Sequence, residues 1–65
     1  MARQPRLTAL EAERQLLVAG FVLMRSKGSH RIYFRKGQRV VLPFHKGKVL
    51  HPKIVRQVLS AINQP

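Results

Sequence analysis

Apolar side chains recur three or four residues apart near the start of the chain, the spacing of one helix face. The pattern comprises Ala9, Ala12, Leu16 and Ala19, with Leu10 and Leu17 beside it. Thr8 and Glu11 have the spacing of a capping box, in which each side chain accepts a hydrogen bond from the other residue's backbone amide. Gly20 suits the left-handed residue that ends many helices. These features predict a helix over residues 9–19.

A second apolar stripe with helical spacing lies near the end of the chain. Its members are Ile54, Val55, Val58, Leu59 and Ile62. Pro52 precedes them and fits the first position of a helix, where its missing N–H costs nothing. The pattern predicts a helix over residues 52–63.

Between the helices, three stretches of alternating and β-branched residues predict strands over 21–26, 30–35 and 39–43. A two-residue turn at Lys27-Gly28 and a three-residue turn at Lys36-Gly37-Gln38 would connect them. That pairing gives a wholly apolar face, which we assign to the core: Phe21, Leu23, Ile32, Phe34, Val40 and Leu42. The other face would carry Val22, Met24, Arg31, Tyr33, Arg35, Arg39 and Val41. A one-residue bulge would invert part of this register.

The order of elements is α-β-β-β-α, which predicts an α+β fold with a three-stranded antiparallel sheet and both helices on one face. Residues 1–7 form a short basic segment broken by Pro5, which we expect to be a flexible arm. Residues 8–65 then make a single domain, with a basic loop over 44–50 between the last strand and the last helix.

The charge balance of the chain points to a polyanionic partner. Thirteen Lys and Arg residues face two Glu and no Asp, a net charge of +11 on 65 residues. Hydrophobic residues make up 45%, too many for a disordered basic tail, so we expect a compact domain that binds nucleic acid or an acidic protein. The longest apolar run, residues 16–24, is far shorter than the roughly 20 residues of a membrane span. The protein is therefore predicted to be soluble and cytoplasmic.

The same composition excludes several kinds of catalytic site. Without cysteine there is no thiolate nucleophile or thiolate zinc site, and without Asp there is no Ser-His-Asp triad. Glu11 and Glu13 lie two residues apart on a helix and do not face each other, which argues against a carboxylate pair. A divalent-metal site would lack carboxylates, so no metal and no cofactor is expected. Histidine acting as a general acid or base beside cations remains.

Lys27-Gly28-Ser29-His30 is the first candidate for such a site. RNA carries its own nucleophile, the 2′-hydroxyl, so cleavage requires a base for that proton and cations for the phosphate. His30 could be the base, with Ser29 and Lys27 as donors and Gly28 allowing a close backbone approach. The alternative is a turn followed by a half-buried, inert strand histidine, which the spacing alone favours.

Two further groups of residues are candidates for RNA contacts. In the loop Pro43-Phe44-His45-Lys46-Gly47-Lys48, His45 could help to bind phosphate or act as a second acid, and Lys46 and Lys48 could contact RNA. An ordinary loop is the alternative. Arg31, Tyr33, Arg35 and Arg39 interleave cations with an aromatic ring, a pattern that can contact phosphates and stack a base. The alternative for this stripe is a solvated sheet surface.

Taken in order, several segments of the chain resemble the HicA (YcfA-like) toxin family. The similarity runs from about Thr8 to Asn63 and rests on these segments: Gly20-Phe21, Lys27-Gly28-Ser29-His30, Tyr33, Pro43-Phe44-His45-Lys46-Gly47 and the two flanking helices. The chain departs from the family at Leu50-His51-Pro52-Lys53, where many members read Leu-Pro-x-Gly, and at Ala61-Ile62-Asn63, where members commonly end in Gly-Leu.

The resemblance implies a fold like a double-stranded RNA-binding domain and an mRNA interferase activity without a metal cofactor. It also implies that His30 is catalytic and that a HicB-like antitoxin covers the active site. A non-catalytic basic RNA-binding module remains the alternative function. The predicted register raises a difficulty, because it turns His30 toward the helices with Ile32 and Phe34. Either the strand end leaves the ring exposed beyond the helices, or a bulge reverses the face and exposes Phe34 for a partner.

Overall fold

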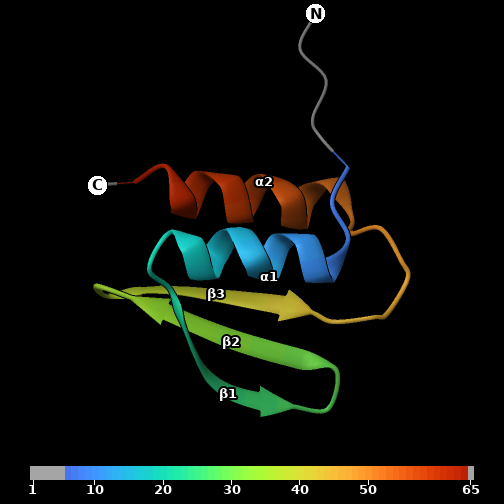
Figure 1. The fold of residues 1–65 in the computed structure, drawn as a ribbon, viewed down its shortest axis with the longest axis horizontal. Coiled ribbons are helices and arrows are strands. Elements are labelled where there is room, and N and C mark those ends of the chain that lie inside the picture. Colours follow the sequence, from blue (N-terminus) through green and yellow to red (C-terminus); the bar gives the residue numbers. More distant parts are fainter. Residues whose placement is uncertain (1–5, 65) are drawn as a thin grey trace, which may run out of the picture.

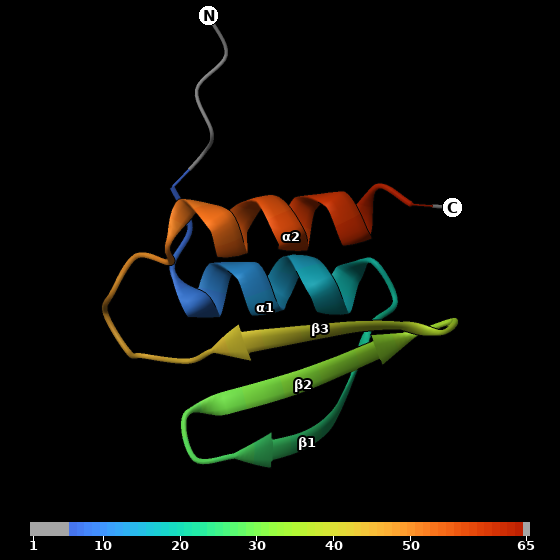
Figure 2. The ribbon, with the colours of Figure 1, turned by 180° about the vertical axis from the view of Figure 1, so that it is seen from behind.

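Two helices lie side by side against one face of a three-stranded antiparallel sheet (Figure 1). The computed structural model describes residues 6–64. The elements are α1 (Ala9–Val18), β1 (Val22–Lys27), β2 (His30–Arg35), β3 (Gln38–Pro43) and α2 (Pro52–Ile62). The strand order is β1-β2-β3, and both helices lie on the same side of the sheet in both views (Figure 2). The predicted α+β architecture is confirmed.

Each helix begins with a side-chain cap. The Thr8 hydroxyl accepts a hydrogen bond from the Glu11 amide at 3.2 Å, and the Glu11 carboxylate accepts one from the Thr8 amide at 2.9 Å, so the predicted capping box is present. α2 begins at Pro52, and its cap is His51, whose Nδ1 accepts from the Lys53 amide at 3.0 Å. Histidine is an unusual cap, and the sequence pattern did not suggest it.

The core lies between the helices and the sheet. Leu16 of α1, Val55 and Val58 of α2, and Tyr33 and Leu42 of the sheet are the largest side chains that are fully buried. Small alanines at positions 9 and 12 of α1 are also buried, which leaves room for the larger core side chains around them. The main stripe of each predicted helix therefore faces the core, whereas Leu10 and Leu17, beside the first stripe, are 58% and 49% exposed.

The register of β2 differs from the prediction. The second turn has two residues, Lys36 and Gly37, with φ of 46° and 80°, so Tyr33 pairs with Val40 rather than with Val41. Positive φ at both central positions is the pattern of a type I′ hairpin turn, whose twist matches that of the strands. Removing one turn residue inverts the face of the neighbouring strand. The assignment of Ile32 and Phe34 to the core is therefore wrong, whereas that of Val40 and Leu42 is confirmed.

β1 is also shifted, because the first turn is Gly28-Ser29 instead of Lys27-Gly28. A bulge between Leu23 and Arg25 shifts the register by one residue, so Leu23 pairs with Tyr33 and Val22 with Phe34. Phe21 is buried as predicted, but Leu23 is 40% exposed and does not belong to the core.

The start of the domain lies earlier than predicted. Leu7, assigned to the flexible arm, is buried, and its carbonyl accepts a hydrogen bond of 2.7 Å from the Leu50 amide. Residues 1–5 of the predicted arm and Pro65 lie outside the described residues. Within residues 6–64, the helices are too short or too polar to cross a membrane.

Candidate active site

The sheet has an open face, which we define as the face turned away from the two helices. Strand pairing arranges its residues in three rows, which are Val22–Phe34–Arg39, Arg25–Ile32–Val41 and Lys27–His30–Pro43. Four residues of the first two rows are apolar, namely Val22, Phe34, Ile32 and Val41, and Val22 and Phe34 are 57% and 41% exposed. Arg25, Lys27, Arg39 and His30 lie beside these apolar residues. The open face therefore offers both apolar surface and positive charge to solvent.

His30 occupies one end of the open face. It is the first residue of β2 and lies between Lys27 of β1 and Pro43 of β3, so ladders on both sides fix its backbone. The residue is exposed, in contrast to the half-buried histidine that the inert alternative assumed. The two-residue second turn reverses the face of β2, and this reversal makes His30 accessible to a large substrate.

The start of the loop after β3 is fastened next to His30. The Phe44 amide donates a hydrogen bond of 2.6 Å to the carbonyl of Ser29, so this loop begins beside the turn that precedes His30. The Arg31 guanidinium lies 3.9 Å from the centroid of the Phe44 ring, within the range of a cation–π contact. His45 follows Phe44 directly and is exposed. It lines a hollow together with Pro43, Lys48 and His51.

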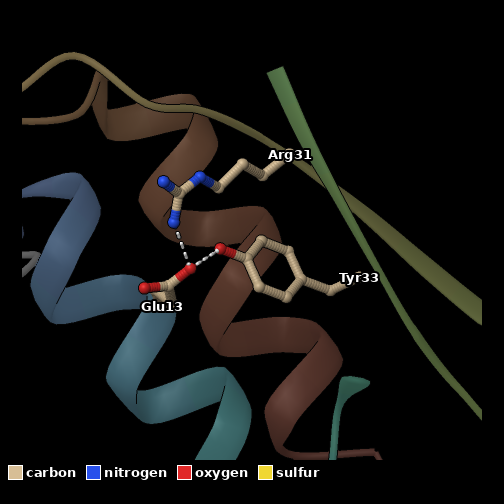
Figure 3. A network of polar contacts seen from close by, with 3 residues as sticks. All are labelled: Glu13, Arg31 and Tyr33. Carbon is tan, nitrogen blue, oxygen red and sulfur yellow. Dashed lines mark hydrogen bonds and ion pairs between the residues drawn. The ribbon is translucent and has the colours of Figure 1, made fainter. Parts of the chain in front are cut away.

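On the face of the sheet that the helices cover, Arg31 and Tyr33 of β2 donate hydrogen bonds to Glu13 of α1 (Figure 3). One carboxylate oxygen accepts from the Arg31 guanidinium at 2.8 Å and from the Tyr33 hydroxyl at 2.5 Å. Burial alone would raise the pKa of Glu13, but the two hydrogen bonds and the charge of Arg31 outweigh it and hold the pKa below its ordinary value. Burial, followed by the nearby carboxylate, raises the pKa of the Tyr33 hydroxyl. Arg31 is thus held between Glu13 on one side and Phe44 on the other.

The predicted RNA-binding stripe is wrong in its placement. Arg31, Tyr33 and Arg35 all point toward the helices, because β2 is inverted relative to the predicted register. Tyr33 is fully buried and presents no ring face on which a base could stack. Arg35 donates to the carbonyls of Ala19 and Ala61 at 2.8 and 3.0 Å, so it joins the ends of the two helices. Of the four, Arg39 remains on the open face.

Sequence reasoning missed two residues of this region. Arg25 lies on the open face beside Ile32, and the bulge that places it there has no clear sequence signal. Glu13 follows Ala9 by four residues and precedes Leu16 by three, so it lies next to the apolar face of the helix. This spacing is the sequence signal that its side chain turns toward the sheet.

The carboxylates lie apart from the open face. Glu11 caps α1, and the Thr8 amide and hydroxyl that hydrogen-bond it lower its pKa. Glu13 is paired behind the sheet. The charges on the open face, from Arg25, Lys27 and Arg39, are thus all positive. In the described residues, His and Glu side chains do not gather in groups of three or more that could hold a metal ion.

The chain was compared with known proteins. A family model described as the HicA toxin of bacterial toxin–antitoxin systems matches residues 10–64. No match was found among curated proteins or among solved structures. The matched segment begins in α1 and ends just after α2, so it includes the whole sheet, His30 and the loop that carries His45.

Proposed function

The chain belongs to the HicA family of bacterial toxin–antitoxin toxins, and we propose that it is an endoribonuclease that cleaves mRNA with His30 as general base. The observation that carries this proposal is the position of His30. The residue is exposed at the end of a cationic sheet face, its backbone is fixed by both neighbouring strands, and Lys27 lies in the adjacent pairing position. An exposed base on a rigid element beside a cation is what attack on a phosphodiester requires.

The chemistry uses a nucleophile that RNA supplies. Neutral His30 takes the proton of a 2′-hydroxyl, and the resulting oxygen attacks the adjacent phosphorus. The P–O5′ bond breaks, which leaves a 2′,3′-cyclic phosphate on one fragment and a 5′-hydroxyl on the other. His45 assists by giving a proton to the departing oxygen, and Lys27 with the Ser29 hydroxyl stabilises charge on the phosphate. Each proton and electron pair is accounted for without a metal ion.

The other RNA contacts in this proposal come from the exposed basic positions around His30. Gly28 at the turn has φ of +58° and open space around it, so a phosphate can approach the backbone closely. Lys46 and Lys48 extend from the loop that begins beside Ser29, and Arg39 adds charge at the far end of the open face. Phosphate contacts of this kind position RNA and make binding depend on salt.

The apolar residues of the open face support a protein partner as well. RNA phosphates gain nothing from Val22, Ile32, Phe34 and Val41, which form a continuous apolar strip over the three strands. We assign this strip to the cognate antitoxin, a HicB-like protein with acidic groups at its rim. Because His30 lies in the neighbouring row, a protein packed on the strip covers the catalytic base and the cations together.

The proposal is tested by His30→Ala in the full chain, with His51→Asn as the matched histidine control. Asn keeps the capping bond at the start of α2, so the control retains the fold. Purified proteins are incubated with single-stranded RNA in the presence of a chelator, and circular dichroism checks folding. We expect His30→Ala to slow cleavage at least about 100-fold and His51→Asn to cleave like the parent.

Cleavage by His30→Ala at the parental rate would show that another group is the base. Intact RNA after incubation with the parent, together with salt-sensitive binding, would favour the non-catalytic RNA-binding module. Growth arrest by the parent that the cognate antitoxin relieves, and that His30→Ala lacks, would connect the cleavage to toxicity.

A further inference from the structure

A polar groove runs along the edge of the sheet where the second half of α2 passes beside the start of β3. We call it the β3–α2 groove. Apart from Ala61, its lining residues are polar: Gln38, Arg39, Arg56, Gln57, Ser60 and Gln64. It lies away from the loop that carries His45, and Arg39 is the residue that it shares with the open face described above.

The floor of the groove is held by hydrogen bonds. The Gln38 side chain accepts from Arg35 at 2.9 Å and donates to the side-chain oxygen of Gln64. Arg35 also donates to the Gln64 carbonyl at 2.9 Å, so β2, β3 and the end of α2 are joined at this point. The groove is therefore shaped before any ligand arrives, and the positive charge of Arg35 lies close to its floor.

The walls of the groove carry unbalanced positive charge. Arg39 comes from β3 and Arg56 from α2; both are exposed, and no carboxylate lines the groove in the described part of the chain. Gln57 and Ser60 add an amide and a hydroxyl on the α2 side. Guanidinium, amide and hydroxyl groups are the usual donors to phosphate and sugar oxygens of nucleic acids.

The groove is continuous with the open face through Arg39. Arg39 pairs with Phe34 of β2. Phe34 lies four residues after His30 on the same strand, so the two positions are about 13 Å apart at roughly 3.3 Å per residue. A single strand with its scissile phosphate at His30 therefore needs only a few nucleotides to pass over Phe34 and reach Arg39. The exposed Phe34 ring lies along this path and offers a surface for base stacking.

We propose that the β3–α2 groove binds the phosphodiester backbone of RNA a few nucleotides away from the cleaved bond, with Arg39 and Arg56 as the phosphate contacts. This inference rests on the proposed nuclease function. The groove thus determines how long a strand the protein holds, while His30 determines where that strand is cut. An acidic protein is the competing occupant, but a lining of polar donors without a large apolar side chain suits a phosphate chain better than a protein surface.

The test uses full-length His30→Ala protein, so that RNA stays intact, and measures fluorescence anisotropy with labelled single-stranded RNAs. The two probes are about 2 and about 16 nucleotides long, so that the short RNA cannot extend from His30 into the groove and the long RNA can. In this background, Arg56→Ala and Arg39→Ala are compared with Arg14→Ala, an exposed cation on α1 outside the groove. Alanine is a good helix former, so Arg56→Ala leaves α2 intact.

We expect Arg56→Ala and Arg39→Ala each to weaken binding of the long RNA by roughly threefold to tenfold and to lower its salt slope by about 0.7. The short RNA should bind the Arg56→Ala protein like its parent. Arg56→Lys, which keeps the charge, should recover part of the loss, and Arg14→Ala should behave like the parent with both probes.

Equal affinities of Arg56→Ala and Arg14→Ala for the long RNA would overturn the proposal, and so would an equal loss with the short RNA. Unchanged RNA affinity with weakened antitoxin binding would also overturn it, and would assign the groove to a protein. Failure of the nuclease function shows separately, as intact RNA after incubation with the parent protein, whatever the groove variants do.

Discussion

Glu13 is the residue that allows two polar side chains of β2 to face the helices. Arg31 and Tyr33 would each be costly beneath α1 without a partner, and a single carboxylate oxygen accepts from both. The same arginine stacks on Phe44, at the start of the loop that leads to His45. A charge pair on the covered side of the sheet thus steadies the loop beside the candidate active site.

Replacing Glu13 with Gln should lower the free energy of unfolding by about 1.5–3 kcal/mol, the range for hydrogen bonds to charged groups. The pH dependence should change as well. Because the folded protein holds the pKa of Glu13 below its ordinary value of 4.5, the carboxylate contributes stability above that pH and loses it as pH falls through the folded pKa. Urea denaturation at several pH values between 3 and 7 checks both effects.

The matched control for this prediction is Gln15→Glu. It makes the reverse exchange, from a neutral amide to a carboxylate, at an exposed position of α1. It should leave the free energy of unfolding nearly unchanged. If Glu13→Gln unfolds with the parent's midpoint and the parent's pH dependence, the pairing seen in Figure 3 contributes nothing to stability.

At the level of elements, the hairpin between β2 and β3 decides which residues reach solvent. Lys36 adopts φ of 46° in this turn, a left-handed conformation that costs most residues about 1–2 kcal/mol. Asn tolerates this conformation and is favoured before Gly in type I′ turns. Lys36→Asn should therefore raise the free energy of unfolding by about 0.5–1 kcal/mol.

Lys36→Gln is the control for this change, because it removes the same charge without favouring a left-handed backbone. Thermal or urea denaturation of both variants measures the difference. Equal stability of the Asn and Gln variants would mean that the turn is not the two-residue type I′ turn. It would also contradict the pairing of β2 with β3 described above.

The helices and the order of elements could be predicted from the sequence because their signals are local. Thr8 with Glu11, Gly20 and Pro52 determine the helix ends within one or two residues, and the apolar stripes identify their buried faces. The prediction of His30 as the catalytic candidate used a local motif too. These features depend on neighbours in the chain and not on the packing of distant segments.

The face of β2 could not be predicted by choosing the more apolar side. Ile32 and Phe34 are apolar and lie on the open face, whereas Arg31, Tyr33 and Arg35 point inward and donate hydrogen bonds to Glu13 or to carbonyls at the helix ends. Those partners lie 16 to 26 residues away in sequence. The apolar pattern was misleading because this sheet presents apolar surface on both faces, which is expected where a second protein binds.

At the scale of the whole molecule, a net charge of +11 on 65 residues creates self-repulsion that a bound acidic partner would relieve. The positive residues of the open face surround an apolar strip, so the structure combines electrostatic attraction with a site for close packing. The first affects how fast a partner associates, and the second how long it stays. An antitoxin that uses both would bind tightly while covering His30.

Phe34→Ser should therefore weaken binding of the cognate antitoxin about tenfold or more, because a central aromatic residue of an interface carries much of its energy. The ring is already 41% exposed in the free protein, so the free energy of unfolding should change little. Leu17→Ser is the matched control, since Leu17 is 49% exposed but lies on α1, away from the open face. Isothermal titration calorimetry with purified antitoxin measures the affinities, and urea denaturation checks the folding of both variants. If Leu17→Ser weakens the complex as much as Phe34→Ser does, or if neither changes it, the antitoxin does not pack on the open face and must inhibit the toxin from elsewhere.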